Sequence, residues 1–336
     1  MTRAFLRRGL FYFRISHNNF NFTANPITTL PRSLTLNKQM IKTYLKSLFF
    51  LFLLTSSNLS KAGEIANLIN RISERNSYVW PDRKIFSELP ANSREVSQSV
   101  LAYQLLQPNS EELKKIIKGK QENLRLTFPD PNSGGYIIVL VSSKNIYSSD
   151  FKITTSDNSI VPLLEKMNYQ GIVEGKNNSF VAISIYENEV MGLICDERGN
   201  FNIGKLKNDQ QNIHIIYNDK DLTKVNPFVC STSDDFKTAK SNQRTGVGTS
   251  SANSVNCLNL YWETDQDIYV DKGSTPAVNS YINGLFNQAN ALYTNDGITI
   301  NLQSLFVWTT SDPYTGPSTG TYLTQFGSNR TSFTGD

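Results

Sequence analysis

The sequence predicts an α+β protein in which a β-rich region precedes an alternating strand–helix–strand segment. Between residues 121 and 230, short apolar and β-branched runs alternate with glycine- and asparagine-containing turns. Short strands at this spacing are typical of an antiparallel sandwich or barrel. From residue 256 onward, an apolar pattern of helical period lies between two apolar strands, which predicts a βαβ unit. The 336-residue length allows two domains of ordinary size.

The positive charge of the chain is concentrated at its N-terminus. The formal net charge is +4, yet residues 1–63 contain nine Lys or Arg and no Asp or Glu. The remainder has 24 basic and 29 acidic residues, so its net charge is about −5. The overall basic pI of 8.8 is therefore no argument for nucleic-acid binding.

Residues 40–62 have the pattern of a secretory signal peptide. Met40 is followed by two lysines, a seven-residue apolar run over 48–54, and small residues before Gly63. The run is too short for a transmembrane helix of the mature protein. Residues 1–39 have two interpretations: an upstream leader produced by a start codon assigned too early, or an acid-free, Arg-rich organelle transit peptide.

Residues 63–120 predict a helical segment. Apolar residues at helical spacing indicate one helix over 63–78, and a second begins near Asn92 and runs through Tyr103 and Leu106. Pro108 ends this second helix, and Asn109 with Glu112 starts a third that extends towards Ile117. The β-rich region then covers 121–230, with strands expected at 124–128, 136–141, 151–155, 171–174, 180–186, 189–195, 201–205 and 214–217.

Residues 231–255 predict a linker, because they are rich in Ser, Thr, Asn and Gly and nearly free of large apolar residues. After it, the first strand of the βαβ unit is expected over Cys257–Tyr269. Ser274 or Thr275 is the expected N-cap of the helix, which stops at Gly297. The second strand is expected over Ile298–Trp308.

The sequences T-D-Q-D-I-Y, A-L-Y-x-x-x-G-I and L-F-V-W in 256–336 resemble the start of the reprolysin-like (adamalysin) metzincin catalytic domain. The glycine-containing strands between Leu124 and Ile216 are similar to the propeptide of the same proteases. The resemblance implies a secreted zinc metalloendopeptidase precursor that acts on protein substrates and is inhibited by its own propeptide. The family's H-E-x-x-H-x-x-G-x-x-H motif is absent, so this sequence is expected to stop before the zinc ligands.

Three residues before the βαβ segment have roles under this resemblance. Activation by proteolysis is expected in the linker, with Lys240 and Arg244 as candidate cleavage residues. Cys230 is the candidate latch, a thiolate that occupies the open position of zinc in the precursor. The alternative is that Cys230 forms a disulfide with Cys195 or Cys257, which an oxidising compartment permits.

The histidines and the acidic residues of the expected first strand give weaker indications of a functional site. The sequence has two histidines, of which His17 lies in the leader and His214 is expected to be a strand residue. Glu263, Asp265 and Asp267 alternate along the expected first strand, which predicts either a calcium site or a solvated strand face. The family's calcium ligand corresponds to Asn259, which is not acidic here. A non-enzymatic, secreted, β-rich binding protein is the alternative to the protease.

Overall fold

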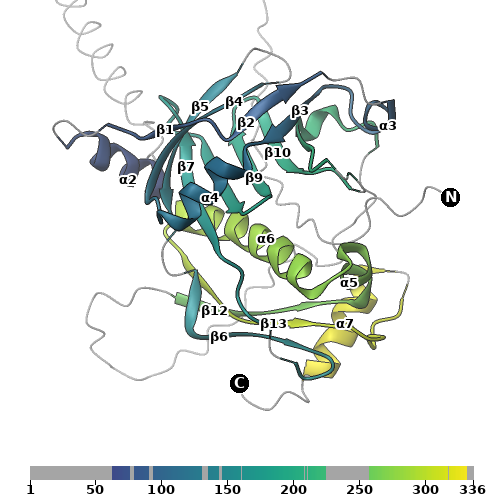
Figure 1. Cartoon of the computed structure of the whole chain (residues 1–336). Helices are drawn as coiled ribbons and strands as arrows, with labels where there is room; N and C mark the ends of the chain where they lie inside the picture. The colour runs from purple at the N-terminus through teal and green to yellow at the C-terminus, as the bar shows by residue number, and fades with distance from the viewer. Residues whose placement is uncertain are drawn as a thin grey trace, which may run out of the picture. The chain divides into compact units, whose positions relative to one another are not determined.

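Two β-sheets on either side of one long helix, α6 (Thr275–Asn295), make up the described part of the chain (Figure 1). The computed structural model describes residues 63–75, 79–90, 94–130, 135–143, 146–159, 161–207, 209, 211–224, 257–316 and 318–330. All of these belong to one unit of the chain. The content is α+β and mostly β, in agreement with the predicted class.

Among the described residues, ten strands form one sheet in the order β1-β4-β5-β7-β8-β9-β10-β11-β3-β2. Neighbouring strands are antiparallel except for β1 and β4, which are parallel. The strands are β1 (Asp82–Arg83), β2 (Phe86–Leu89), β3 (Tyr103–Pro108), β4 (Asn123–Phe128), β5 (Tyr136–Ser142), β7 (Lys166–Val173), β8 (Phe180–Tyr186), β9 (Val190–Asp196), β10 (Gly199–Lys205) and β11 (His214–Asn218).

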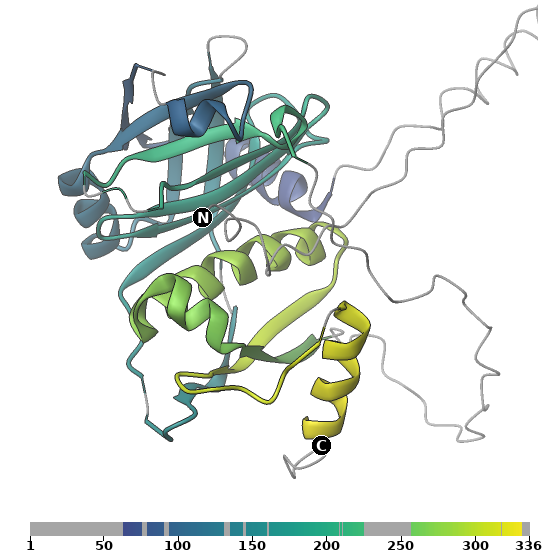
Figure 2. The same cartoon turned by 90° about the vertical axis from the view of Figure 1, so that its right-hand side faces the viewer.

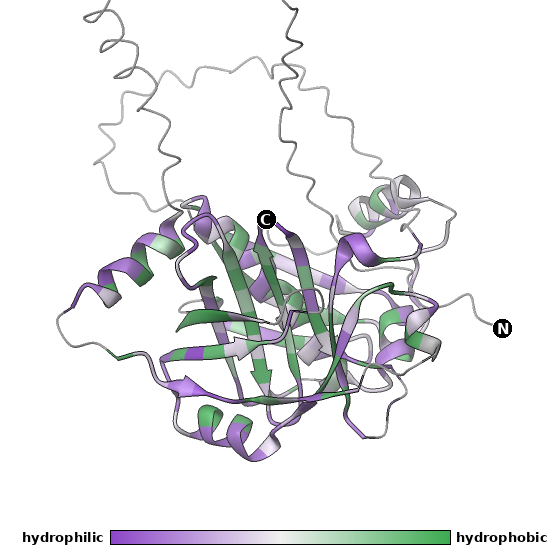
Figure 3. Cartoon of the chain, turned by 90° about the horizontal axis from the view of Figure 1, so that it is seen from above, coloured by the Kyte–Doolittle hydropathy of each residue, from purple (hydrophilic) through white to green (hydrophobic). Residues whose placement is uncertain are grey.

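This sheet curls around one apolar core. Phe86 on the last strand meets Phe128 on the second, with ring centroids 5.6 Å apart, so the two ends of the sheet approach each other. Every second residue of β8 faces inwards, and Val181, Ile183 and Ile185 are fully buried there. Figure 3 shows the apolar residues concentrated on these strands. The predicted sandwich or barrel is therefore a curled antiparallel sheet.

Short helices cover the curled sheet. Helix α2 (Glu64–Ser73) packs Ile65, Ala66 and Ile69 on the outer face of β5, β7 and β8. Helix α4 (Ser110–Lys118) contributes Leu113, Ile116 and Ile117 to the inner core. Asn109 caps α4 by accepting from the Glu112 amide at 3.2 Å, as its position in the sequence predicts. The remaining short elements are α3 (Arg94–Ser97) and the 3₁₀ turn η1 (Asp219–Asp221).

The second sheet contains three parallel strands in the order β12-β13-β6: β12 (Cys257–Thr264), β13 (Thr299–Val307) and β6 (Tyr147–Thr155). Strands β12 and β13 are joined through α5 (Gln266–Lys272) and α6, which is the predicted βαβ connection. Ser274 is the N-cap of α6, and Gly297 takes a left-handed φ of 74° after its end. The chain continues into α7 (Thr319–Arg330).

Helix α6 lies between the two sheets, as the views in Figures 1 and 2 agree. One face buries Val278, Ile282 and Phe286 against the three-stranded sheet. Another face packs on β7, β8 and β9 of the curled sheet. Helix α6 has 21 residues, and its apolar and polar residues lie in separate stripes along it. Two of its faces can therefore be buried against different partners.

Two predicted elements were wrong, and the segment 63–120, which was expected to be helical, also contains strands β1, β2 and β3. The helix expected from Asn92 through Leu106 ends after Ser97, and Tyr103–Pro108 forms strand β3 instead. Its apolar residues pair with β11 and β2, so tertiary pairing overrides a local helical pattern. The first strand of the βαβ unit stops at Thr264 rather than Tyr269, because Asp265 caps α5.

Candidate functional site

The best-defined polar centre lies at the carboxyl ends of the parallel strands β12 and β13. The Glu263 carboxylate there accepts three hydrogen bonds from aromatic side chains. Trp308 Nε1 donates to Oε1 at 2.6 Å, Tyr261 OH donates to Oε2 at 2.8 Å, and Tyr314 OH also donates to Oε1. Ligand sites of open parallel sheets occur at this end of the strands, which makes Glu263 the candidate site residue.

Aromatic rings surround the Glu263 carboxylate. Trp308 meets Tyr314 edge-on with centroids 6.4 Å apart, and Phe326 of α7 lies 6.4 Å from the rings of both Tyr261 and Tyr314. Burial, together with Glu263, raises the pKa of Tyr314 well above its ordinary value, so this phenol stays a hydrogen-bond donor. Because both carboxylate oxygens accept hydrogen bonds, Glu263 orients the aromatic side chains around it.

The polar loops that follow the three strands are tied together at the same end of the sheet. Ser156 Oγ, just after β6, accepts from the Thr309 and Thr310 amides at 3.1 Å each. Asp312 accepts from the Gln266 amide at 2.7 Å and from the Tyr314 amide at 2.8 Å. These carboxylate and hydroxyl groups satisfy backbone donors, so their arrangement is that of a rigid loop cluster.

The predicted acidic face of Glu263, Asp265 and Asp267 does not form. Asp265 is the N-cap of α5 and accepts from the Ile268 amide at 3.1 Å, and Asp267 lies in the first turn of that helix. Carboxylates at a helix N-terminus are stabilised by the helix dipole, which explains both positions without a metal. The three residues therefore belong to two elements, and the strand alternation that predicted a calcium site is absent.

The described residues do not fit a zinc site. They contain no cluster of three or more His, Cys, Asp or Glu side chains that could hold a metal ion. His214 is fully buried in β11, where its Nε2 accepts from the Val190 amide at 3.1 Å and its Nδ1 lies 3.0 Å from the Asn212 carbonyl. Burial lowers the pKa of His214 to about 4, and both ring nitrogens are occupied, as expected for a strand residue.

The structure describes the side chain of Cys195 but not those of Cys230 and Cys257. Cys195 is a buried free thiol on β9, and burial raises its pKa well above the ordinary value. A thiol in such surroundings is a poor nucleophile. Cys230, Lys240 and Arg244 lie outside the described residues, as does the side chain of Cys257.

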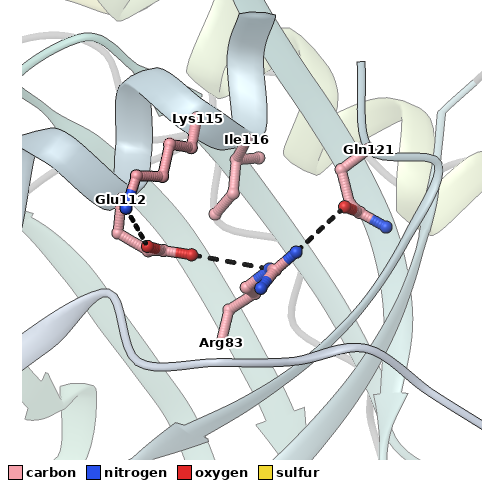
Figure 4. Close-up of a pocket in the computed structure, with 5 residues that line it drawn as sticks. All are labelled: Arg83, Glu112, Lys115, Ile116 and Gln121. Carbon is pink, nitrogen blue, oxygen red and sulfur yellow. Dashed lines mark hydrogen bonds and ion pairs between the residues drawn. The ribbon is translucent and has the colours of Figure 1, made fainter. Parts of the chain in front are cut away.

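A shallow recess over α4 is the pocket shown in Figure 4, with a volume of about 120 Å³. Arg83 lies across it, with its Nε 3.5 Å from a Glu112 carboxylate oxygen and its Nη2 3.4 Å from Gln121 Oε1. Lys115 also pairs with Glu112, at 3.6 Å, beside the apolar side chain of Ile116. Two cations sharing one carboxylate at the surface form weak ion pairs, and their geometry does not indicate catalysis.

The sequence analysis missed a row of buried asparagines on α6. Asn283 faces β6, Asn287 faces the curled sheet, and Asn290 faces β13. Asn287 Nδ2 lies 3.2 Å from the carbonyls of Tyr169 and Ile183, and Asn290 accepts from Gln170 at 2.5 Å while donating to the Ile300 carbonyl at 2.8 Å. Their spacing of four and three residues in the sequence was the available signal.

Lys166 of β7 is half-buried near this row, and its Nζ atom is enclosed. Its Nζ has no hydrogen-bond partner among the described residues and lies 4.9 Å from the centre of the Tyr147 ring. Burial lowers the pKa of Lys166 to about 7. An amine with a pKa of about 7 changes its protonation around physiological pH, so Lys166 is a titratable group beside Tyr147 of β6.

Comparisons with known proteins add little. No family model and no curated protein matches this sequence. Among solved structures, one match is a chain from a chaperone–substrate complex that is 13% identical, with a TM-score of 0.26. The match covers 43% of this chain and 96% of the other, and a TM-score this low carries no argument. None of the helices in the described residues is long and apolar enough to cross a membrane.

Proposed function

We propose that this chain is part of the precursor of a secreted zinc metalloendopeptidase of the reprolysin-like metzincin type. The observation that carries the proposal is the parallel β12–α6–β13 unit, which follows the mostly antiparallel curled sheet in the sequence. This order is the one expected for a propeptide followed by the start of the catalytic domain. The motifs T-D-Q-D-I-Y, A-L-Y-x-x-x-G-I and L-F-V-W all belong to the β12–α6–β13 region.

In this proposal, residues 40–62 direct export, the region up to 230 is the propeptide, and residues 231–255 contain the activation site. Lys240 or Arg244 precedes the cleaved bond, and Cys230 holds the precursor latent through zinc. The described residues contain no cluster of three or more His, Cys, Asp or Glu side chains that could hold a metal ion, so the proposal names no zinc ligand or catalytic glutamate among them. No catalytic step is assigned to residues of this chain.

The decisive experiment follows the reading frame past the codon for Asp336 and expresses the whole precursor. An H-E-x-x-H-x-x-G-x-x-H motif within about a hundred codons is expected. The precursor cut within 231–255 should cleave casein, and a chelator should abolish this activity until zinc is restored. A stop codon, or a cut precursor without chelator-sensitive activity, would instead favour the non-enzymatic binding protein.

Cys230 is tested in the same precursor. Cys230→Ser should give proteolysis before the linker is cut, because water then replaces the thiolate at zinc. Cys195→Ser is the matched control, since that thiol is buried in β9 and should leave latency unchanged. If Cys230→Ser lowers stability with unchanged latency, the disulfide explanation holds and the latch is rejected.

A further inference from the structure

Strand β6 leaves the sheet to which its neighbours in sequence belong. Strands β5 and β7 pair with each other in the curled sheet, and the intervening residues cross to the three-stranded sheet instead. There β6 runs parallel to β13, with Lys152 opposite Ser304 and Thr155 opposite Val307. Figure 1 shows β6 beside β13, below α6. Without β6, strand β13 would be an unpaired edge.

The apolar side chains of this segment complete two clusters under α6. Ile153 is 1% exposed and packs with Val278 and Ile282 of α6 and with Leu305 and Val307 of β13. Ile146, 4% exposed, packs with Phe286, Ile300 and Leu302. Both clusters combine residues from 146–155 with residues from 278–307, so neither set can bury its apolar surface alone.

Polar contacts fix the register of β6 at both ends. At the start, Tyr147 OH donates to Asn283 Oδ1 of α6. At the end, the Ser156 amide donates to the Val307 carbonyl at 3.0 Å, and Ser156 Oγ accepts from the Thr309 and Thr310 amides. Separating the segment would leave buried backbone and side-chain groups without partners, which is costly.

We propose that residues 146–156 form a donated strand that the C-terminal part of the chain needs in order to stay folded. Residues 257–330 contribute only two strands, β12 and β13, to the three-stranded sheet, and a sheet usually needs three or more strands over an apolar face to be stable. A chain cut between 231 and 255 therefore remains one noncovalent complex, with 146–156 as the occupant of the β13 edge. This proposal does not depend on protease activity.

The test uses the full chain with the recognition site of a specific protease placed between residues 231 and 255. After the cut, the two pieces should co-elute in size-exclusion chromatography at nanomolar concentration without denaturant. They should separate, and the C-terminal piece should lose its helical circular dichroism, only when denaturant is added. Separation into two folded pieces in buffer would overturn the proposal.

A pair of neighbouring substitutions locates the interaction. Ile153→Asp places a charge inside the apolar cluster and should weaken the cut complex by about a hundredfold or more. Lys152→Asp is the matched control, because Lys152 is exposed on the opposite face, and it should change the affinity by about threefold or less. Equal affinities for the two variants would contradict strand donation.

If the Ile153→Asp chain does not fold, hydrogen exchange of the cut wild-type complex is a second test of the proposal. In the cut wild-type complex, amides of β6 and β13 should exchange through one shared opening and respond equally to added denaturant. If the β6 amides exchange completely while the β13 amides stay protected, β13 does not need its partner strand and the proposal fails.

Discussion

The two faces of strands β7 and β8 differ in kind. On the inner face, Tyr169 and Ile183 belong to an apolar cluster of fully buried side chains. On the outer face, Gln170 and Ser184 hydrogen-bond with asparagines of α6. Both faces are buried, yet the inner face is held by packing, whereas the outer face combines packing against α2 with directed hydrogen bonds to α6.

The two faces therefore contribute differently to the stability of the core and to the position of α6. Apolar packing is non-directional and supplies most of the stability of a core. Hydrogen bonds between buried groups add less stability but require a specific geometry, so they fix where α6 lies on the sheet. Gly284 supports this interpretation, because a Cβ atom there would lie 2.4 Å from Met191 Sδ. The helix approaches the sheet as closely as its side chains allow.

The largest effect is expected on the inner face. Ile183→Ala removes a fully buried side chain from the middle of the curled sheet and should lower the free energy of unfolding by about 2–5 kcal/mol. Urea denaturation followed by circular dichroism measures this change. Ser184→Ala, the adjacent residue on the outer face, should cost only about 1 kcal/mol. Equal losses would mean that the two faces are not different in kind.

A smaller effect is expected on the outer face, with a contrast between two asparagines. Asn287→Ala leaves the Tyr169 and Ile183 carbonyls and the Ser143 hydroxyl without this partner, and should cost about 2–3 kcal/mol. Asn279→Ala should cost about 1 kcal/mol or less, because its Nδ2 has no hydrogen-bond partner among the described residues and Asn283 Nδ2, which donates to its Oδ1, also donates to the Asn279 carbonyl. Thermal and urea unfolding of both variants would check this order. A larger loss in the free energy of unfolding for Asn279→Ala than for Asn287→Ala would contradict it.

The last effect concerns Lys166 and depends on pH. Burial lowers its pKa from 10.5 to about 7, so between these values the unfolded chain binds a proton that the folded chain lacks. The free energy of unfolding contributed by this group therefore rises as the pH rises through that window. Lys166→Met should therefore stabilise the protein most at neutral pH and below, with the gain shrinking towards about pH 10.

Urea titrations of wild type and Lys166→Met at several pH values test this. Lys152→Met is the matched control, since Lys152 is exposed on β6, and it should show no such trend. A difference between wild type and Lys166→Met that stays constant from neutral pH to about pH 10 would show that the folded chain keeps Lys166 protonated.

Local signals in the sequence were sufficient wherever chain neighbours decide the structure. Asn109 and Ser274 are N-caps because their side chains reach amides three residues later, which depends only on sequence spacing. Strand β8 spans Phe180–Tyr186 as predicted, since an apolar run between two turns leaves few alternatives. The βαβ order from β12 to β13 follows in the same way from periodicity.

Local signals misled where a cap competed with a pattern. Asp265 alternates with Glu263 in sequence, yet its carboxylate accepts from the Ile268 amide and starts a helix. Glu263 instead accepts hydrogen bonds from Tyr261 of β12 and from Trp308 and Tyr314, which follow β13. The hydrogen bonds to Glu263 could not be predicted from the sequence, because they join residues up to 51 positions apart.

By itself, the sequence determined the mixed fold class, most strands of the β-rich region and the helix between β12 and β13, because each depends on nearby residues. Only the tertiary structure decided that Tyr103–Pro108 is a strand and that β6 joins β13. The same holds for the row of asparagines on α6, which look like surface residues in sequence but are buried by a second sheet. Strand partners and buried polar contacts are set by distant segments, whose apolar surfaces and hydrogen-bonding groups must be satisfied together.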